Sequence, residues 1–182
     1  MTTAVHNPAP KSAPKSVPWS EAGEIEALTF DVSGETFALE ASIVREILDL
    51  LPETNVPGAR PFVGALVNFR GRIIPLADIR FAFGMPRAEP TIDSRIIVVE
   101  VDVDGAPCLA GLRADKVNEV RTLAREASEA PPRIGMAWRP ELVECLIKHG
   151  ETVIIFPDLQ ALFHAGRTKV AGEGEIIHYP KS

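Results

Sequence analysis

The sequence is poor in cysteine, in long apolar runs and in positive charge, and each shortage excludes a class of protein. Its 182 residues contain two cysteines, Cys108 and Cys145, and no C-x-x-C pair, so a disulfide between them has no support and a reducing cytoplasm is the simplest setting. No apolar run approaches the roughly 20 residues that span a bilayer, and residues 1–16 lack the apolar core of a signal peptide. We therefore expect a cytoplasmic protein without direct membrane insertion.

The charge balance argues against nucleic acid as the main partner. The formal net charge is −6 and the isoelectric point is near 5.3, whereas neutralising phosphates requires a basic face. The apolar fraction of 46% is ordinary for a soluble globular protein, and the length suffices for one ordinary domain or two small ones with a buried core.

Signatures of catalysis are also scarce. The four histidines, His6, His149, His164 and His178, fall in tails, a turn and a helix end, and none has an H-E-x-x-H pattern or a cysteine at metal-ligand spacing. Ser33 lacks the preceding glycine of a G-x-S-x-G elbow, and no glycine-rich loop opens a helix after a strand. The sequence therefore predicts a non-enzymatic protein with no metal or cofactor, although a hydrolase or transferase site built from distant residues stays open as an alternative.

What the sequence does contain is a series of alternating apolar segments between two polar tails. Residues 1–23 hold four prolines and almost no large apolar groups, so we expect a disordered tail. Residues 24–165 alternate with the period of β-strands, interrupted by turn signals. We interpret Thr122–Arg139 as a long polar loop, and residues 166–182 as a C-terminal tail whose I-I-H-Y segment either adds an edge strand or stays loose.

The stretch Pro61–Gly84, P-F-V-G-A-L-V-N-F-R-G-R-I-I-P-L-A-D-I-R-F-A-F-G, organises the rest of the chain. Its first part alternates between two faces, Arg70-Gly71 breaks the alternation, and residues 72–76 resume it. This pattern predicts a β-hairpin with Gly71 in the turn. Asp78 is a candidate N-cap of a short helix that the last glycine of the stretch ends.

The two halves of the chain repeat one order of elements. In the first half V-S-G is followed by V-R-E-I, a hairpin, and a helix with Asp first and Phe five residues later; in the second half V-D-G is followed by V-N-E-V, a hairpin and a similar helix. Chance similarity is the alternative to a duplication. We expect two small β-units, roughly 24–85 and 94–165, with or without an exchange of strands. Because units this short would otherwise expose unpaired edges, closed or nearly closed barrels are favoured.

The same central stretch resembles the signature of the CheW family, the coupling proteins of bacterial chemosensory arrays. The similarity lies in a proline with a glycine three residues on, then N-[LF]-R-G, a Val/Ile-rich strand and D-[LI]-R, and it extends over about residues 24–165. It implies a mostly β fold of two packed five-stranded Src-homology-3-like β-barrels with short helices. The chain departs from the family at Phe69, where leucine is usual, and at Arg113, which can alter one wall of a groove. Both departures leave the adaptor role intact and bear on which receptor class is served.

The resemblance assigns partner-binding roles to two residues. Arg70 in N-F-R-G matches the family's arginine tied to receptor coupling and kinase activation, and Asn68 and Gly71 belong to the same motif. Glu46 in V-R-E-I matches a glutamate of a similar Q-E-I segment near the receptor-facing surface. From composition alone, Arg70 is a solvated turn arginine and Glu46 a rim carboxylate on an edge strand.

Apolar candidates for the same surfaces are less distinct. Most are expected in the core, and a few to line a groove between the units, where a helical hairpin docks by its apolar ridge. The large side chains of residues 73–76 cannot all face one side of a strand, so we expect one to stay exposed for a partner barrel. The candidates are Val44, Ile47, Ile73, Ile74, Val117 and Val120.

The resemblance implies an adaptor that is recruited to membrane-associated receptor arrays. It would bridge the cytoplasmic tips of chemoreceptors and the regulatory domain of a CheA-type histidine kinase. We expect the chain to be a monomer in isolation and to bind no nucleic acid. Two alternatives stay open: a scaffold of a pilus-type or other non-flagellar chemosensory system, and a stand-alone small-barrel module that binds peptide or ligand.

Overall fold

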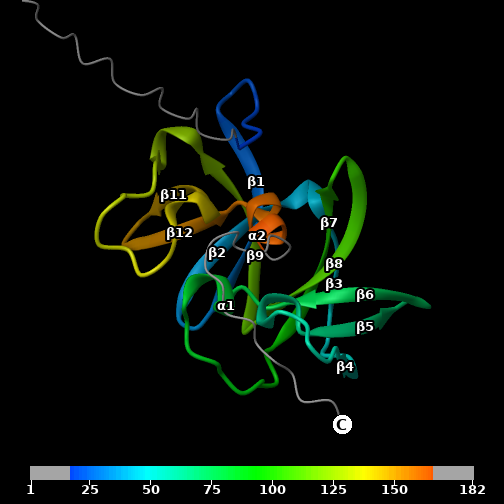
Figure 1. Ribbon diagram of the computed structural model, residues 1–182. Coiled ribbons are helices and arrows are strands. Elements are labelled where there is room, and N and C mark those ends of the chain that lie inside the picture. The colour runs from blue at the N-terminus through cyan, green and yellow to red at the C-terminus, as the bar shows by residue number, and fades with distance from the viewer. Residues whose placement is uncertain (1–16, 166–182) are drawn as a thin grey trace, which may run out of the picture.

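The fold is mostly β within residues 17–165, the part of the chain that the computed structural model describes (Figure 1). Of the predicted tails, residues 1–16 and 166–182 lie outside this part. The two described α-helices are α1 (Arg80–Phe83) and α2 (Leu159–Ala165). The strands are β1 (Glu24–Val32), β2 (Glu35–Glu40), β3 (Val44–Leu48), β4 (Glu53–Asn55), β5 (Ala65–Phe69), β6 (Arg72–Ala77), β7 (Arg95–Val103), β8 (Ala106–Ala114), β9 (Lys116–Ala124), β10 (Ser128–Glu129), β11 (Val143–His149) and β12 (Thr152–Pro157).

The strands form two six-stranded sheets, with the orders β10-β11-β12-β2-β1-β9 and β3-β7-β8-β6-β5-β4. In each sheet the two edge strands are consecutive in the chain: a single 3₁₀ turn, Arg125–Ala127, separates β9 from β10, and residues 49–52 separate β3 from β4. Counting each such pair as one bent strand leaves five strands per sheet and leads the chain from one edge of the sheet to the other. The prediction of a mostly β, Src-homology-3-like fold is confirmed.

The sheets do not divide the chain between residues 85 and 94. The β1–β2 hairpin belongs to the sheet of β9–β12, and the β7–β8 hairpin belongs to the sheet of β3–β6. Two equivalent parallel pairings join these hairpins to their sheets: Thr36 pairs with Ile154 between β2 and β12, and Leu76 pairs with Gly111 between β6 and β8. Each half therefore supplies its first hairpin to the sheet of the other half, and neither half contains a complete sheet.

The main core lies between the two sheets and is rich in phenylalanine. Phe30, Phe37 and Phe83 are fully buried there, and the last two meet edge to face at 5.3 Å between ring centroids. α2 lies between the sheets near the centre of Figure 1 and adds Leu162 to this core. Each buried side chain of this size stabilises the fold by about 1.5–3 kcal/mol. One smaller cluster fills the interior of each curled sheet.

Three local expectations needed correction. Residues 17–23 belong to the folded part, because Val17 is 6% exposed and packs inside the β9–β12 sheet. The segment Thr122–Arg139 is not one loop: β9 runs to Ala124, and β10 pairs with β11. The helix after the central hairpin begins at Arg80 rather than next to Asp78, although the Asp78 carboxylate accepts the backbone N–H of Arg80 at 3.0 Å.

The predicted end of that helix is confirmed. Gly84 has a φ of 65°, the left-handed conformation that glycine adopts without steric cost, and its N–H bonds to the carbonyl of Arg80. No helix among residues 17–165 has the length and apolar character needed to cross a membrane.

Candidate partner-binding surface

The turn between β5 and β6 presents Arg70 at the tip of the hairpin. Arg70 and Gly71 have φ values of 51° and 79°, the signature of a two-residue turn of type I′. Asn68 supports the turn, because its side-chain oxygen accepts the N–H of Gly71 at 2.8 Å. Two other hairpin turns place Ser33 and Asp104 at the corresponding position, where short polar residues tolerate the left-handed backbone better than arginine does. An arginine here is kept at a conformational cost.

Arg70 meets Glu46 across the sheet. Its guanidinium nitrogen lies 2.6 Å from a carboxylate oxygen of Glu46, and its Cζ lies 5.4 Å from the ring centroid of Phe69. Glu46 is on β3, at one edge of the sheet, and β5 is the strand next to the other edge, so the contact requires the sheet to curl toward closure. The side chain of Arg70 is 72% exposed and that of Glu46 is 30% exposed. Such exposed pairs add at most about 1 kcal/mol to stability, so the pair serves mainly to position two charges at the surface.

Four of the apolar candidates border the core between the sheets. Val44 and Ile47 on β3 pair with Val99 and Ile97, and Val117 and Val120 on β9 pair with Phe30 and Leu28. All four partners belong to the main core, and paired residues share a face of their sheet. Ile47 is 42% exposed and Val120 is 55% exposed, whereas Val44 and Val117 are half-buried. Each sheet thus places one exposed apolar side chain at the border of this core.

The two isoleucines of the central hairpin differ in their exposure to solvent. Ile73 is 63% exposed and lies opposite Asn68 on the outer face of the hairpin. Ile74 is 3% exposed and belongs to the cluster inside the sheet, so it is a core residue and the expectation of a partner contact there is corrected. The alternation of the strand decides both outcomes, since neighbouring side chains point to opposite faces.

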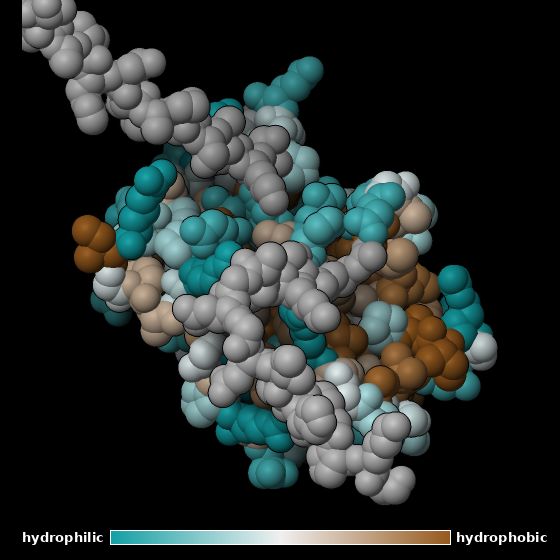
Figure 2. All heavy atoms as spheres, in the orientation of Figure 1, coloured by the Kyte–Doolittle hydropathy of each residue, from teal (hydrophilic) through white to brown (hydrophobic). Residues whose placement is uncertain are grey.

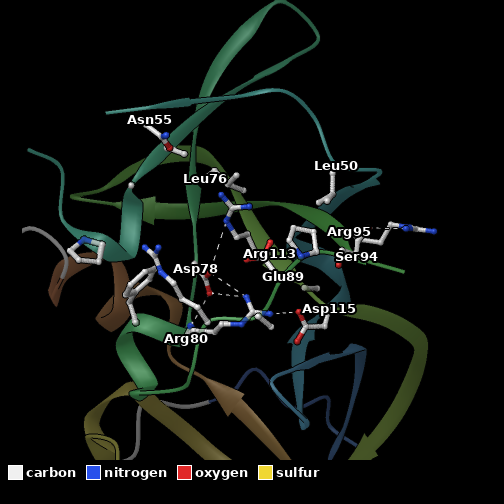
Figure 3. Close-up of a pocket in the computed structure, with 18 of the residues that line it drawn as sticks. Leu50, Asn55, Leu76, Asp78, Arg80, Glu89, Ser94, Arg95, Arg113 and Asp115 are labelled. Carbon is white, nitrogen blue, oxygen red and sulfur yellow. Dashed lines mark hydrogen bonds and ion pairs between the residues drawn. The ribbon is translucent and has the colours of Figure 1, made fainter. Parts of the chain in front are cut away.

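Sequence reasoning missed a charged junction around Arg80 (Figure 3). Arg80 is 4% exposed; its guanidinium pairs with Asp78 at 3.1 Å and with Asp115, and its Nε donates to the Ser33 hydroxyl at 3.1 Å. The Asp115 carboxylate also accepts the N–H of Ser33 at 2.7 Å. These contacts join α1, the β1–β2 turn and the segment between β8 and β9. The D-x-R spacing of Asp78 and Arg80 was the one signal in the sequence that could have indicated the pair.

Arg113 extends this junction into a polar cavity of about 470 Å³. It binds the Glu53 carboxylate with both terminal nitrogens, and its Nε lies 4.0 Å from Asp78. Figure 3 shows Arg113, on β8, and Arg80, on α1, approaching Asp78. The departure from the family pattern at Arg113 therefore forms an ion pair in the wall of this cavity. Arg80 and Arg113 are both paired with acidic side chains here, which fits a structural junction better than a substrate site.

The described residues offer little reactive chemistry. Among residues 17–165, no group of three His, Cys, Asp or Glu side chains is arranged to hold a metal ion. Cys108 and Cys145 are both free thiols. Burial, with a smaller contribution from the charge of Glu144, raises the pKa of Cys145 to about 12, so this thiol stays protonated at neutral pH.

The fold and these surfaces define a class of protein, a two-sheet β scaffold with exposed charged and apolar docking positions. A family model described as CheW-like domain matches residues 26–167, which is most of the chain. The chain belongs to the CheW-like family, so the family resemblance seen in the sequence is confirmed.

Known proteins similar to this chain are chemotaxis proteins. The probable chemotaxis protein CheW of Rhizobium etli is 26% identical over 149 residues, which cover 82% of this chain and 94% of that protein. The chemotaxis protein CheW of Bacillus subtilis is 26% identical over 136 residues, covering 74% and 84%. The crystal structure of the scaffolding protein TtCheW from Thermoanaerobacter tengcongensis superposes with a TM-score of 0.69 at 30% identity, covering 80% of this chain and 97% of the other. Proteins of this family are chemotaxis scaffold adaptors and not enzymes. As a member of the family, this chain is a scaffold adaptor as well.

Proposed function

We propose that this chain couples chemoreceptors to a CheA-type histidine kinase in a chemosensory array. Membership of the CheW-like family supports the proposal. The observation that carries it is the Arg70–Glu46 pair, because the two residues selected independently by resemblance meet at 2.6 Å on one exposed surface.

Arg70 and Glu46 are proposed to contact the receptor tip. A guanidinium offers five donors in a fixed fork, which suits carboxylates and backbone carbonyls of a helical partner. Ile47 and Val120 border the core between the sheets, and they would bind the apolar ridge of the receptor's helical hairpin. The exposed Ile73 on the outer face of the central hairpin would contact a barrel of the kinase regulatory domain.

The proposed mechanism is geometric and needs no reactive group. One scaffold binds two partners on separate surfaces, so the binding of one changes the free energy of binding the other through the shared sheet. Interfaces of about 800 Å² per partner are typical of stable complexes, and weaker ones function when many copies assemble into an array. The chain would act as a single copy between its partners, recruited to the membrane by the receptors.

The test uses substitutions that preserve the turn. Arg70→Asn keeps a residue that favours the first position of a type I′ turn, so the fold is retained while the cation is lost. We expect receptor-stimulated autophosphorylation of the kinase, reconstituted with receptor-containing membranes, to fall about tenfold, the loss of about 1.4 kcal/mol at a contact that matters for binding. Arg70→Glu should reduce it further by placing a second negative charge beside Glu46.

Arg139→Asn is the matched control. Arg139 is 70% exposed and is paired with Glu141 at 3.6 Å, so it resembles Arg70 in exposure and pairing but lies far from the central hairpin in the sequence. It should leave kinase control unchanged. Normal kinase control by a folded Arg70→Glu variant would show that the site is assigned wrongly.

A further inference from the structure

An apolar groove of about 610 Å³ opens where β6 and β8 separate. The two parallel strands pair only at Leu76 with Gly111 and at Ala77 with Leu112. Pro75 and Pro107 line the groove on the two strands, and neither has an N–H to extend the ladder between them. The strands therefore diverge and leave a gap in the sheet.

The groove is lined mainly by hydrophobic side chains and bordered by arginines. Ile73, Val103 and Leu109 contribute from the strands, and Phe163 contributes from α2. Figure 2 shows hydrophobic residues gathered on the right of the view, where β6 and β8 lie in Figure 1. Ile73 is 63% exposed, an unfavourable position for a large apolar side chain in water. A cover that removes Ile73 from water would stabilise the molecule.

The chain itself supplies a segment at this place. The described part ends at Ala165, whose carbonyl accepts a hydrogen bond from Arg60, an arginine that lines the groove, at 3.2 Å. Residues 166–182 follow, and their apolar side chains are concentrated in Ile176-Ile177-His178-Tyr179. About ten residues separate Ala165 from this cluster, and an extended chain of that length reaches up to about 33 Å. The cluster can therefore reach any part of the groove.

Charge complementarity favours this segment over an unrelated apolar one. Glu173 and Glu175 immediately precede the apolar cluster, and the groove is bordered by Arg60 and Arg72. Arg72 is exposed and has no ion-pair partner among the residues that the structure describes. An acidic segment with an apolar end thus matches a basic rim around an apolar floor.

We infer that the β6–β8 groove is the docking site of residues Glu173–Tyr179 of the same chain. Ile176, Ile177 and Tyr179 occupy the groove, and the two glutamates face the arginines. Because the segment is tethered next to the groove, its effective concentration is in the millimolar range, so a weak contact suffices to keep it docked. The docked segment covers Ile73, the side chain proposed to contact the kinase, so the kinase domain must displace the segment to bind there.

Cys108 provides a direct readout of docking. It lines the groove and is exposed, whereas Cys145 is buried with a pKa near 12 and does not compete for a thiol reagent at neutral pH. In the full chain, the reaction of Cys108 with Ellman's reagent should be slow. In the variant Ile176→Asp/Ile177→Asp it should be at least about fivefold faster, because the docked state that shields the thiol is no longer the more populated one.

The matched control is Val170→Asp, which adds a charge to the same tail outside the docking cluster and should leave the rate unchanged. Equal rates for the wild type and the double variant would overturn the inference. A shielding that strengthens with protein concentration would assign the occupant to the tail of a second copy and would also overturn it.

A second measurement follows the tail instead of the groove. Tyr179 is the single tyrosine of the chain, so incorporated 3-fluorotyrosine gives one fluorine NMR signal. Ile73→Asp should move that signal to the position found in the double variant, while Ile92→Asp, at a side chain that is 91% exposed and outside the groove, should not. A signal that Ile73→Asp leaves unmoved would contradict docking at this groove.

Discussion

Arg80 is a buried arginine whose guanidinium meets acidic side chains from two parts of the chain. Asp78 precedes it in the same turn, and Asp115 comes from the segment between β8 and β9. Ser33, from the β1–β2 turn of the other sheet, bonds both Arg80 and Asp115. Removing the guanidinium would leave the Asp115 carboxylate without its cation and would leave Asp78 with only its 4.0 Å contact to Arg113.

We predict that Arg80→Ala lowers the free energy of unfolding by about 2–3 kcal/mol, less than a fully buried pair would lose because Asp115 is partly exposed. Urea unfolding measures the change. Arg121→Ala, which removes an exposed arginine paired with Glu119, should cost less than about 1 kcal/mol. Similar losses for the two variants would contradict the role assigned to Arg80.

The thiol of Cys145 makes stability depend on alkaline pH. Its pKa is raised from 9.0 to about 12, so the folded state binds this proton more tightly than the unfolded state does. The contribution is fully present below pH 9 and is lost as the pH rises toward 12. Compared with Cys145→Ala, the wild type should lose at most about 1.4 kcal/mol more per pH unit in that window. Urea titrations of both proteins across the window test this, and parallel curves would refute it.

At the level of single residues, the sequence predicted candidates for the site but not their contacts or their burial. Arg70 and Glu46 were each identified from local motifs, but their contact depends on the curling of a sheet in which β3 and β5 are not neighbours. Ile74 was misassigned because a hairpin pattern gives the alternation of faces without saying which face the core takes. Val17 was missed because one buried side chain leaves no trace in the composition of a proline-rich segment.

Among the elements, the central hairpin was predicted well and β10 was not. The alternation of β5 and β6, interrupted by a glycine that takes positive φ, is visible in the sequence alone. β10 has two residues, too few for any periodicity, and it exists because β11 offers an edge to pair with. Short strands of this kind are determined by tertiary contacts rather than by local pattern.

The parallel pairing of β6 with β8 depends on the absence of a side chain at Gly111. A Cβ there would lie 2.9 Å from Ile96 Cγ2 and 3.1 Å from Leu76 Cδ1, both in the packed interior of the sheet. We predict that Gly111→Ala destabilises the protein by about 1–3 kcal/mol, the usual cost of overpacking a core.

Gly64 is a matched control for this prediction. A Cβ at Gly64 would meet only backbone oxygens, at 3.6 Å or more, and its φ of −94° suits any residue. Gly64→Ala should therefore change the free energy of unfolding by less than about 0.5 kcal/mol. Thermal or urea unfolding of the two variants decides the matter, and an equally mild effect at Gly111 would show that the sheet yields easily at this crossing.

In the molecule as a whole, the sequence predicted the repeated order of elements but not how the repeats combine. A hairpin has the same periodicity whether it joins the sheet of its own half or that of the other half. The observed exchange places β1–β2 with β9–β12 and β7–β8 with β3–β6. The two sheets are therefore halves of one cooperative unit, which would hold the proposed partner surfaces at a fixed spacing.

This scaffold is proposed to bind a kinase regulatory domain through an exposed face of its β5–β6 hairpin. The direct measurement is a calorimetric titration of the full chain into the purified regulatory domain of a CheA-type kinase from the same organism. We predict saturable binding that Ile73→Asp weakens at least about tenfold and that Ile92→Asp leaves unchanged. Absence of binding between the two folded proteins, or equal binding by both variants, would contradict it.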